Sequence, residues 1–292
     1  MTGAKGARAM AQSDAITRLS ADIRIQTIRA LEQAGFGHIG GCMSVADTLA
    51  VLYGGELNIR PEQPDWPERD YLVMGKGHCG PVLYAALALK GYFPMDWLNT
   101  VNQPGTRLPS HCDRLKTPGI DMSTGSLGQG LSCAAGIALG LRMQGRSNRV
   151  FCIVGDGELQ EGQIWEAAAA AEHLHLNRLI LLIDENKRQL DGYVCDVCGG
   201  DPAEKFRAFG WNVVRVCGWD TDAILHEIRA ATEQAGAPSA IVLETVKGMG
   251  ASFAEHERNN HYMVITKEMA VEAVAEIHRR LSAGTYPAGE VV

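Results

Sequence analysis

The 292-residue chain is 46% hydrophobic and 21% charged, proportions that are ordinary for a globular protein. Its 27 basic and 34 acidic side chains give a net charge of −7, which argues against nucleic acid as a partner because a phosphate backbone needs a basic face. No apolar stretch is long enough to cross a bilayer and the N-terminus has no apolar signal core, so we expect a cytoplasmic protein without a membrane partner.

The first half of the chain contains helices separated by glycine-rich loops. Residues 1–13 have the composition of a flexible tail, and the segment that follows, to residue 34, shows helical periodicity. The apolar run 71–74 predicts a short buried strand that leads through the loop "GKGHCG" into a helix. Residues 91–124 contain several prolines and glycines and predict a loop-rich insertion.

The second half alternates between strands and helices. We expect strands over 149–154 and 179–184, and then the strands "WNVVRV" and "AIVLETV", each pair joined by a helix. Strands that are apolar throughout and joined by helices indicate a parallel β-sheet with helices on both faces. The chain is therefore predicted to be one α/β domain over 14–265, followed by a C-terminal helix and tail over 266–292.

Two polar side chains follow the ends of neighbouring strands in this pattern. Asp156 lies just past the strand 149–154 and Asn186 just past the strand 179–184, so both should reach the same rim of the sheet, where α/β proteins bind ligands. Two hard oxygen donors with open positions suit Mg²⁺, and Gly155 and Gly157 would let the backbone approach a phosphate. The alternative is a tight "GDG" turn with Asn186 as a helix cap, but the pairing of the two residues favours a metal site.

Two other motifs are weaker. The loop "GKGHCG" also satisfies GxGxxG after a strand, but this pattern alone is weak evidence for dinucleotide binding and leaves the "GDG" and asparagine pair unexplained. Eight cysteines are scattered along the chain, and we expect them to be reduced. Cys195 and Cys198 form a single CxxC without further ligands at zinc spacing nearby, which makes metal or redox use of this pair a minor alternative.

The segment "GDGELQEG" begins with Gly155, Asp156 and Gly157, and Asn186 follows after the intervening residues 158–185. This pattern is similar to the thiamine diphosphate signature, and specifically to that of transketolases. The resemblance implies the thiamine diphosphate-binding fold known as the PP domain. It implies that Asp156, Asn186 and the backbone carbonyl of Arg188 hold Mg²⁺, or Ca²⁺, on the diphosphate. The cofactor-binding residues it implies around them are Gly155, Gly157 and Glu158, and a glutamate there would also favour the helix N-terminus.

Four of the nine histidines lie in glycine-containing or polar loops that each resemble a transketolase loop. The resemblance places His38 and His111 near the bound sugar, His78 against the diphosphate, and His261 near both cofactor and substrate. Imidazoles around a ketose can bind hydroxyls, move protons and polarise a carbonyl at neutral pH.

A further loop, "TGSLGQG", resembles the one that lies along the cofactor, with contacts expected from Gly125, Ser126 and Leu127. Three neighbouring positions depart from the usual family pattern. Ile39 and Ser126 stand where proline is usual, and Lys76 replaces the asparagine of "NGH". These departures bear on substrate preference more than on cofactor binding.

The resemblance covers only the diphosphate-binding part of a transketolase. The pyrimidine-binding domain, whose glutamate helps to generate the nucleophilic carbon of the cofactor, is expected on a partner chain. We therefore interpret the chain as the N-terminal subunit of a split transketolase, in an α2β2 heterotetramer that transfers a two-carbon ketol unit from a sugar phosphate or analogue to an aldose. Glu161 is expected near the partner's glutamate.

Two alternatives remain open. The chain could be a 1-deoxy-xylulose-phosphate-synthase-like or 2-oxoacid-decarboxylating subunit with the same cofactor, although the four histidines favour sugar transfer. It could also be a subunit that binds cofactor or partner without turnover.

Overall fold

A computed structural model describes residues 2–190 and 192–287. Its centre is a five-stranded sheet in the order β2-β3-β4-β8-β7, in which every neighbouring pair is parallel. The strands are β2 (Tyr71–Met74), β3 (Val150–Gly155), β4 (Leu179–Glu185), β7 (Asn212–Cys217) and β8 (Ser239–Glu244). The predicted parallel sheet is confirmed, with strand boundaries that shift by one or two residues.

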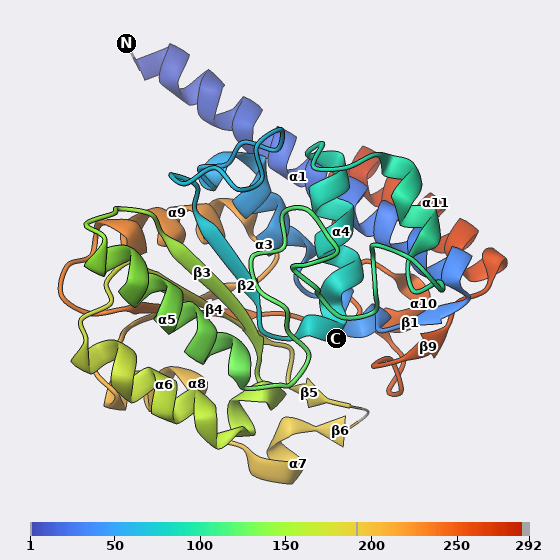
Figure 1. Cartoon of the computed structure of the whole chain (residues 1–292). Coiled ribbons are helices and arrows are strands. Elements are labelled where there is room, and N and C mark those ends of the chain that lie inside the picture. Colours follow the sequence, from blue (N-terminus) through green and yellow to red (C-terminus); the bar gives the residue numbers. More distant parts are fainter. Residues whose placement is uncertain (1, 191, 288–292) are drawn as a thin grey trace.

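Helices cover both faces of the sheet, as predicted (Figure 1). Side chains alternate along each strand between two apolar cores: Phe151 and Ile153 pack with the first, and Val150 and Cys152 with the second. Strands that are apolar at every position are the expected sequence for a sheet buried on both sides.

The first core contains most of the helices. They are α1 (Thr2–Ala34), α2 (Ile39–Met43), α3 (Ala46–Val51), which continues as a π-helical turn to Glu56, α4 (Gly80–Leu89), α9 (Thr221–Glu233), α10 (Ser252–Glu255) and α11 (Lys267–Ala283). The second core is covered by α5 (Gln129–Met143), α6 (Gly162–His173) and α8 (Pro202–Ala208). None of the helices that the structure describes combines the length and apolar character needed to cross a membrane.

Short elements connect the main helices and strands. They are the 3-10 turns η2 (Gly77–Cys79), η3 (Met95–Thr100) and η4 (Gly157–Gln160), the pair β1 (Phe36–Gly37) with β9 (Met263–Val264), the pair β5 (Arg188–Gln189) with β6 (Gly192–Tyr193), and the single-turn helix α7 (Val194–Cys198). The insertion 91–124 is loop-rich as predicted, with η3 as its regular element. Helix α1 begins at Thr2, so it includes most of the segment predicted as a tail.

A buried arginine joins segments that are far apart in the sequence. Arg24 is fully buried on α1 and forms an ion pair with Asp47 at 2.6 Å. Its guanidinium also donates to the backbone carbonyls of Met43 at 3.1 Å and Met249 at 3.0 Å, and to the hydroxyl of Tyr286. A buried charge is tolerated only when it is paired and hydrogen-bonded, so the N-terminal helix, two loops and the C-terminal segment are fixed to one another at this point.

Candidate active site

A cavity of about 410 Å³ opens at the carboxyl ends of the strands. Many of the residues that line it follow β2, β3, β4 and β8, and others come from the segments around His38 and His111, so the fold brings together side chains that are distant in sequence. Thirteen predicted site residues line this cavity, namely His38, His78, His111, Gly125, Leu127, Gly155, Asp156, Gly157, Glu158, Glu161, Asn186, Arg188 and His261. Ser126 does not line it and its side chain is exposed.

Asp156 lies deep in the cavity at the point where β3 ends. One carboxylate oxygen accepts the backbone N–H of Gly157 at 2.8 Å, and the other accepts that of Lys187. Burial, followed by the nearby charge of Asp184, raises the pKa of Asp156 to about 7. The side chain makes no ion pair with the residues that the structure describes, which leaves a buried carboxylate that a bound cation would stabilise.

Asn186 is oriented by Asp184, a buried residue at the end of β4. The carboxylate of Asp184 accepts hydrogen bonds from the side-chain nitrogen of Asn186 at 2.8 Å and from the hydroxyl of Ser44 at 2.7 Å. Lys76 forms an ion pair with the same carboxylate and donates to the carbonyl of Gly41 at 2.9 Å. The ion pair raises the pKa of Lys76 despite its burial, so Lys76 carries its charge in the wall of the cavity.

Some of the cavity residues fit a metal ion and a diphosphate. Asp156, Asn186 and Arg188 line the cavity, and carboxylate, amide and backbone carbonyl oxygens are the donors that Mg²⁺ and Ca²⁺ prefer. A side chain at Gly155 would meet no atom closer than Lys76 Cδ at 3.8 Å, so the glycine leaves open a space that a Cβ would fill. In the described part of the chain no cluster of three or more His, Cys, Asp or Glu could hold a metal by itself.

Glu158 differs from the expectation that it opens the next helix. Its side chain turns inward from η4 and is almost fully buried. Its carboxylate accepts the backbone N–H groups of Gly128 at 3.0 Å and Gly155 at 3.2 Å, and burial raises its pKa to about 7. Glu158 therefore joins the loop before α5 to the end of β3, which shapes the floor of the cavity.

The four histidines singled out in the sequence form one group. The ring of His38 lies 5.2 Å from that of His78, 5.8 Å from that of His111 and 5.2 Å from that of His261, measured between ring centroids. His78 and His261 are 5.1 Å apart. Four loops that are far apart in the sequence thus bring their imidazoles together in the cavity wall.

Burial keeps several of these imidazoles uncharged. It is the largest cause that lowers the pKa of both His38 and His261 to about 4, with His78 adding to the effect in both cases. The pKa of His111 is also lowered, again mainly by burial. At neutral pH these rings are neutral hydrogen-bonding groups, which suits the binding of sugar hydroxyls.

Backbone anchors fix the loop that carries His111. The hydroxyl of buried Tyr84 donates to the carbonyls of Pro109 at 2.9 Å and His111 at 3.2 Å. Gly125 adopts φ +151°, and a Cβ at this position would approach the His111 ring to 3.0 Å. Only glycine combines that backbone angle with that contact.

Two lysines in the cavity wall are absent from the set of site residues predicted from the sequence. Lys76, which in the sequence is only a departure from "NGH", follows β2 and lines the cavity. Lys247 also lines it, three residues after the end of β8, with its ammonium near His261. Their positions just past strand ends are the signal that identifies Asp156 and Asn186, and the same reasoning extends to them.

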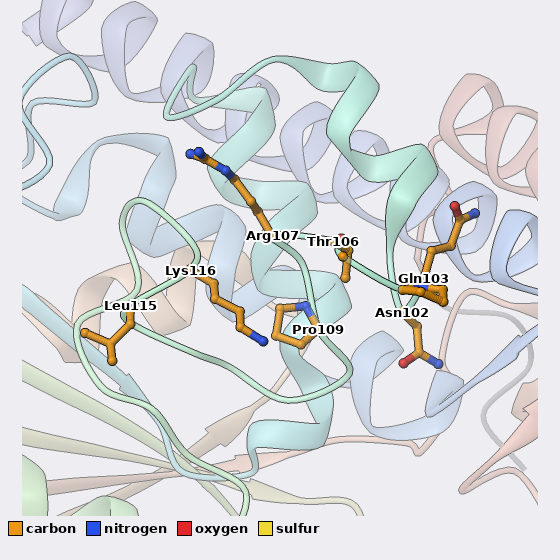
Figure 2. A pocket seen from close by; sticks show the side chains of 9 residues that line it. Asn102, Gln103, Thr106, Arg107, Pro109, Leu115 and Lys116 are labelled. Carbon is orange, nitrogen blue, oxygen red and sulfur yellow. The ribbon is translucent and has the colours of Figure 1, made fainter.

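Two other cavities do not contain the four histidines. The larger one, about 720 Å³, lies along residues 102–116, and Figure 2 shows the side chain of Lys116 directed toward Pro109 while Arg107 points away from both. Another, about 380 Å³, shares Asp156 and Gln160 with the candidate site and has Cys195 and Cys198 in its wall. Both thiols are free and exposed, and the structure gives the pair no further metal ligands among the described residues.

Comparisons with known proteins agree with the geometry. The model of the family "Transketolase, thiamine diphosphate binding domain" matches residues 16–282. The chain is 51% identical over 258 residues to the 6-deoxy-6-sulfo-D-fructose transketolase subunit SqwG of Clostridium sp. (strain MSTE9), covering 88% of this chain and 94% of the relative. It is 37% identical over 242 residues to one subunit of the apulose-4-phosphate transketolase of Actinobacillus succinogenes, covering 82% of this chain and 87% of that protein.

The fold comparison gives the same result. Transketolase from Leishmania mexicana superposes with a TM-score of 0.84 at 30% identity, covering 91% of this chain but 41% of that longer chain. The predicted family and fold are thus confirmed by an independent alignment of sequence and of structure. The chain belongs to the transketolase family and contains its thiamine diphosphate-binding domain.

Proposed function

We propose that this chain is the N-terminal subunit of a split transketolase, which transfers a two-carbon ketol unit from a ketose to an aldose. The observation that carries the proposal is a single cavity lined by two chemically distinct sets of residues. Four histidines whose rings lie close together form one set, and Asp156, Asn186 and Gly155 belong to the other. Such a cavity suits a polyhydroxylated substrate beside a metal-bound diphosphate.

The residues of this chain would bind and orient the reactants. Asp156, Asn186 and the carbonyl of Arg188 would hold Mg²⁺ or Ca²⁺, and Gly155 and Gly157 would lie against the diphosphate. Thiamine diphosphate, when bound, supplies the nucleophilic carbon and the electron sink for cleavage beside a carbonyl. The neutral histidines would donate hydrogen bonds to the sugar hydroxyls and carbonyl, and would move protons as the carbon–carbon bond breaks and forms.

A second chain would complete the site. Glu161 is exposed at the rim of the cavity, and Leu127 and Leu190 expose apolar side chains beside it. A partner with the pyrimidine-binding domain would cover this rim and bring its glutamate near Glu161, and two copies of each chain would form the cytoplasmic α2β2 enzyme. Two relatives that are covered over most of their length are named as subunits, which supports a two-chain enzyme.

The donor is proposed to be an anionic ketose. The relatives named above act, by their names, on a sulfonated fructose and on apulose 4-phosphate. Both sugars carry an anionic group, so a sulfonated ketose and a phosphorylated ketose are the two ketol donors to compare.

The test is reconstitution with the neighbouring pyrimidine-domain chain. The pair should transfer ketol units from a sulfonated or phosphorylated ketose to an aldose phosphate when thiamine diphosphate and Mg²⁺ are present, and the single chain should not. Ketol transfer by the single chain would contradict the two-chain proposal. Release of CO₂ from pyruvate by the pair, without ketol transfer, would support the decarboxylating alternative instead.

A further inference from the structure

The side chains of Lys247 and His261 are in contact, and the lysine can act only as the hydrogen-bond donor in that contact. Lys247 is only 4% exposed in the loop after β8, and its ammonium lies 3.3 Å from Nδ1 of His261. The same ammonium donates to the backbone carbonyl of Leu190 at 2.6 Å. The lysine is therefore held in place at one end by the loop after β4 and directed at one particular nitrogen of the histidine.

The backbone around the pair is also fixed. Asn260, which precedes His261, is fully buried, and its side-chain nitrogen donates to the carbonyls of Lys247 at 2.8 Å and Ala254 at 2.9 Å. The two loops that carry the lysine and the histidine are thus joined twice, once between the two side chains and once from the side chain of Asn260 to the carbonyl of Lys247. Both contacts are made within the chain.

An ammonium group has three donors and no acceptor. Where it faces Nδ1, that nitrogen must accept, so a neutral imidazole carries its proton on Nε2. We propose that Lys247 is a positioning residue that fixes His261 as the Nε2–H tautomer, so that His261 serves the cavity as a hydrogen-bond donor and not as a base. This role deepens the ketol-transfer function proposed above and rests on it for the identity of the oxygen that receives the hydrogen bond.

The charges around His261 agree with this assignment. Burial has the largest effect on its pKa, followed by the positive charge of Lys247 and by His78 and His38, all of which lower it, while Cys79 opposes them slightly. A proton on Nδ1 would place two donors opposite each other. Protonation of His261 therefore requires the lysine to move away, and a neutral donor is maintained over the pH range in which an ordinary histidine would become charged.

In the proposed reaction such a donor is useful at a defined point. Negative charge develops on the sugar oxygen when its carbonyl carbon is attacked, and a fixed N–H directed at that oxygen stabilises the transition state without rearranging. A base at the same place would instead accept a proton from a hydroxyl. The tautomer therefore decides whether His261 can polarise the carbonyl.

The experiment is nitrogen NMR of the full chain labelled with ¹⁵N-histidine, with His261→Gln used to assign the signals. In the wild-type protein His261 should be an Nε2–H tautomer at pH 7 and should remain neutral to low pH. Lys247→Met should mix the two tautomers and move the titration midpoint toward the ordinary imidazole value of about 6.5. Lys247→Arg, which restores a donor, should keep the wild-type tautomer. The matched control is Lys205→Met, because Lys205 donates to the backbone carbonyl of Gly199, away from the histidines.

An Nδ1–H tautomer in the wild-type chain would overturn the proposal, even if no variant could be purified. An unchanged His261 spectrum in Lys247→Met would overturn it as well. The NMR measurement needs neither cofactor nor partner, so it tests the tautomer independently of the proposed function. If the spectrum is as expected but the reconstituted complex shows no ketol transfer, the tautomer is supported and the function is refuted. In an active complex, Lys247→Met should lower kcat more than it raises KM and should shift the acidic limb of the pH profile upward, which Lys247→Arg should reverse.

Discussion

The carboxylate of Asp184 accepts the side-chain N–H of Asn186 at 2.8 Å, which fixes the direction of the asparagine amide. The amide oxygen is held on the other side, where it accepts the backbone N–H of Arg188 at 3.1 Å. Asp184 is itself neutralised by Lys76. A buried ion pair thus orients an uncharged oxygen donor at the place where we propose a metal ion.

Replacing either Asn186 or Asp184 should weaken metal-dependent cofactor binding. Asn186→Ala removes an oxygen donor, and Asp184→Asn leaves the donor in place without its orientation. Residues that orient a metal ligand typically contribute about 10- to 100-fold in affinity, so Asp184→Asn should lower the affinity for Mg²⁺ by that factor. Calorimetry of the reconstituted complex with Mg²⁺ and thiamine diphosphate measures both effects. Asn177→Ala, outside the cavity, is the control, and wild-type affinities in Asn186→Ala would refute the metal assignment.

The ion pair between Lys76 and Asp184 should also contribute to stability. Lys76→Met leaves the carboxylate of Asp184 buried without a countercharge, and breaking a buried pair in this way costs about 3–5 kcal/mol. Urea unfolding of the chain measures the loss. The double variant Lys76→Met/Asp184→Asn removes both charges and should recover part of the stability, whereas equal losses in the single and double variants would show that the charge is not the cause.

Gly155→Ala should separate cofactor binding from folding. The added methyl group meets nothing closer than 3.8 Å within the chain, so the unfolding midpoint should change little. The methyl group would project into the space proposed for the diphosphate, and the affinity for thiamine diphosphate should fall at least tenfold, or by about 1.4 kcal/mol. Gly140→Ala on α5, where a Cβ also meets nothing within 4 Å, is the matched control. Full affinity in Gly155→Ala would place the diphosphate elsewhere.

The histidine group predicts how stability depends on pH. His38 and His261 have a pKa of about 4 in the folded chain, against about 6.5 for an exposed imidazole. As the pH falls below about 6.5, the unfolded chain binds protons before the folded chain does. The contribution of these two histidines to the free energy of unfolding therefore decreases between about pH 6.5 and 4, and it is constant above pH 6.5.

Urea midpoints at pH 7 and pH 5 measure this decrease. His38→Asn removes one of the imidazoles and should make the difference between the two midpoints smaller. His278→Asn on α11 controls for the loss of an exposed histidine. A difference in His38→Asn as large as in the wild-type chain would show that His38 does not remain neutral in the fold.

Strand ends are the part of the site that can be predicted from the sequence. The apolar runs before Gly155 and Asn186 identify two parallel strands, and the order of parallel strands brings their carboxyl ends to one rim. Asp156 and Asn186 indeed line one cavity. The histidines are indicated only by the family resemblance, because nothing in a loop such as "PSHCD" indicates which other loop it will meet.

Side-chain direction cannot be predicted in the same way. The sequence suggests that Glu158 favours the N-terminus of the helix that follows, but a 3-10 turn intervenes and directs the carboxylate toward the backbone of Gly128, a residue on a different loop. Lys76 and Lys247 lie just past strand ends, but their burial could not be predicted because lysine is usually exposed. Their burial depends on acceptors supplied by other segments, namely Asp184 and the carbonyl of Leu190.

The hydrogen bonds of Arg24 connect the last described residues of the chain to the cavity. Met43 ends the short helix after His38, and Met249 follows Lys247 by two residues, so the guanidinium supports both segments from behind. Tyr286 packs its hydroxyl against that same guanidinium. Proteolysis or an engineered deletion that removed Tyr286 would therefore loosen loops far from the cleavage point, and a preparation trimmed at this end would show altered histidine signals before it showed loss of secondary structure.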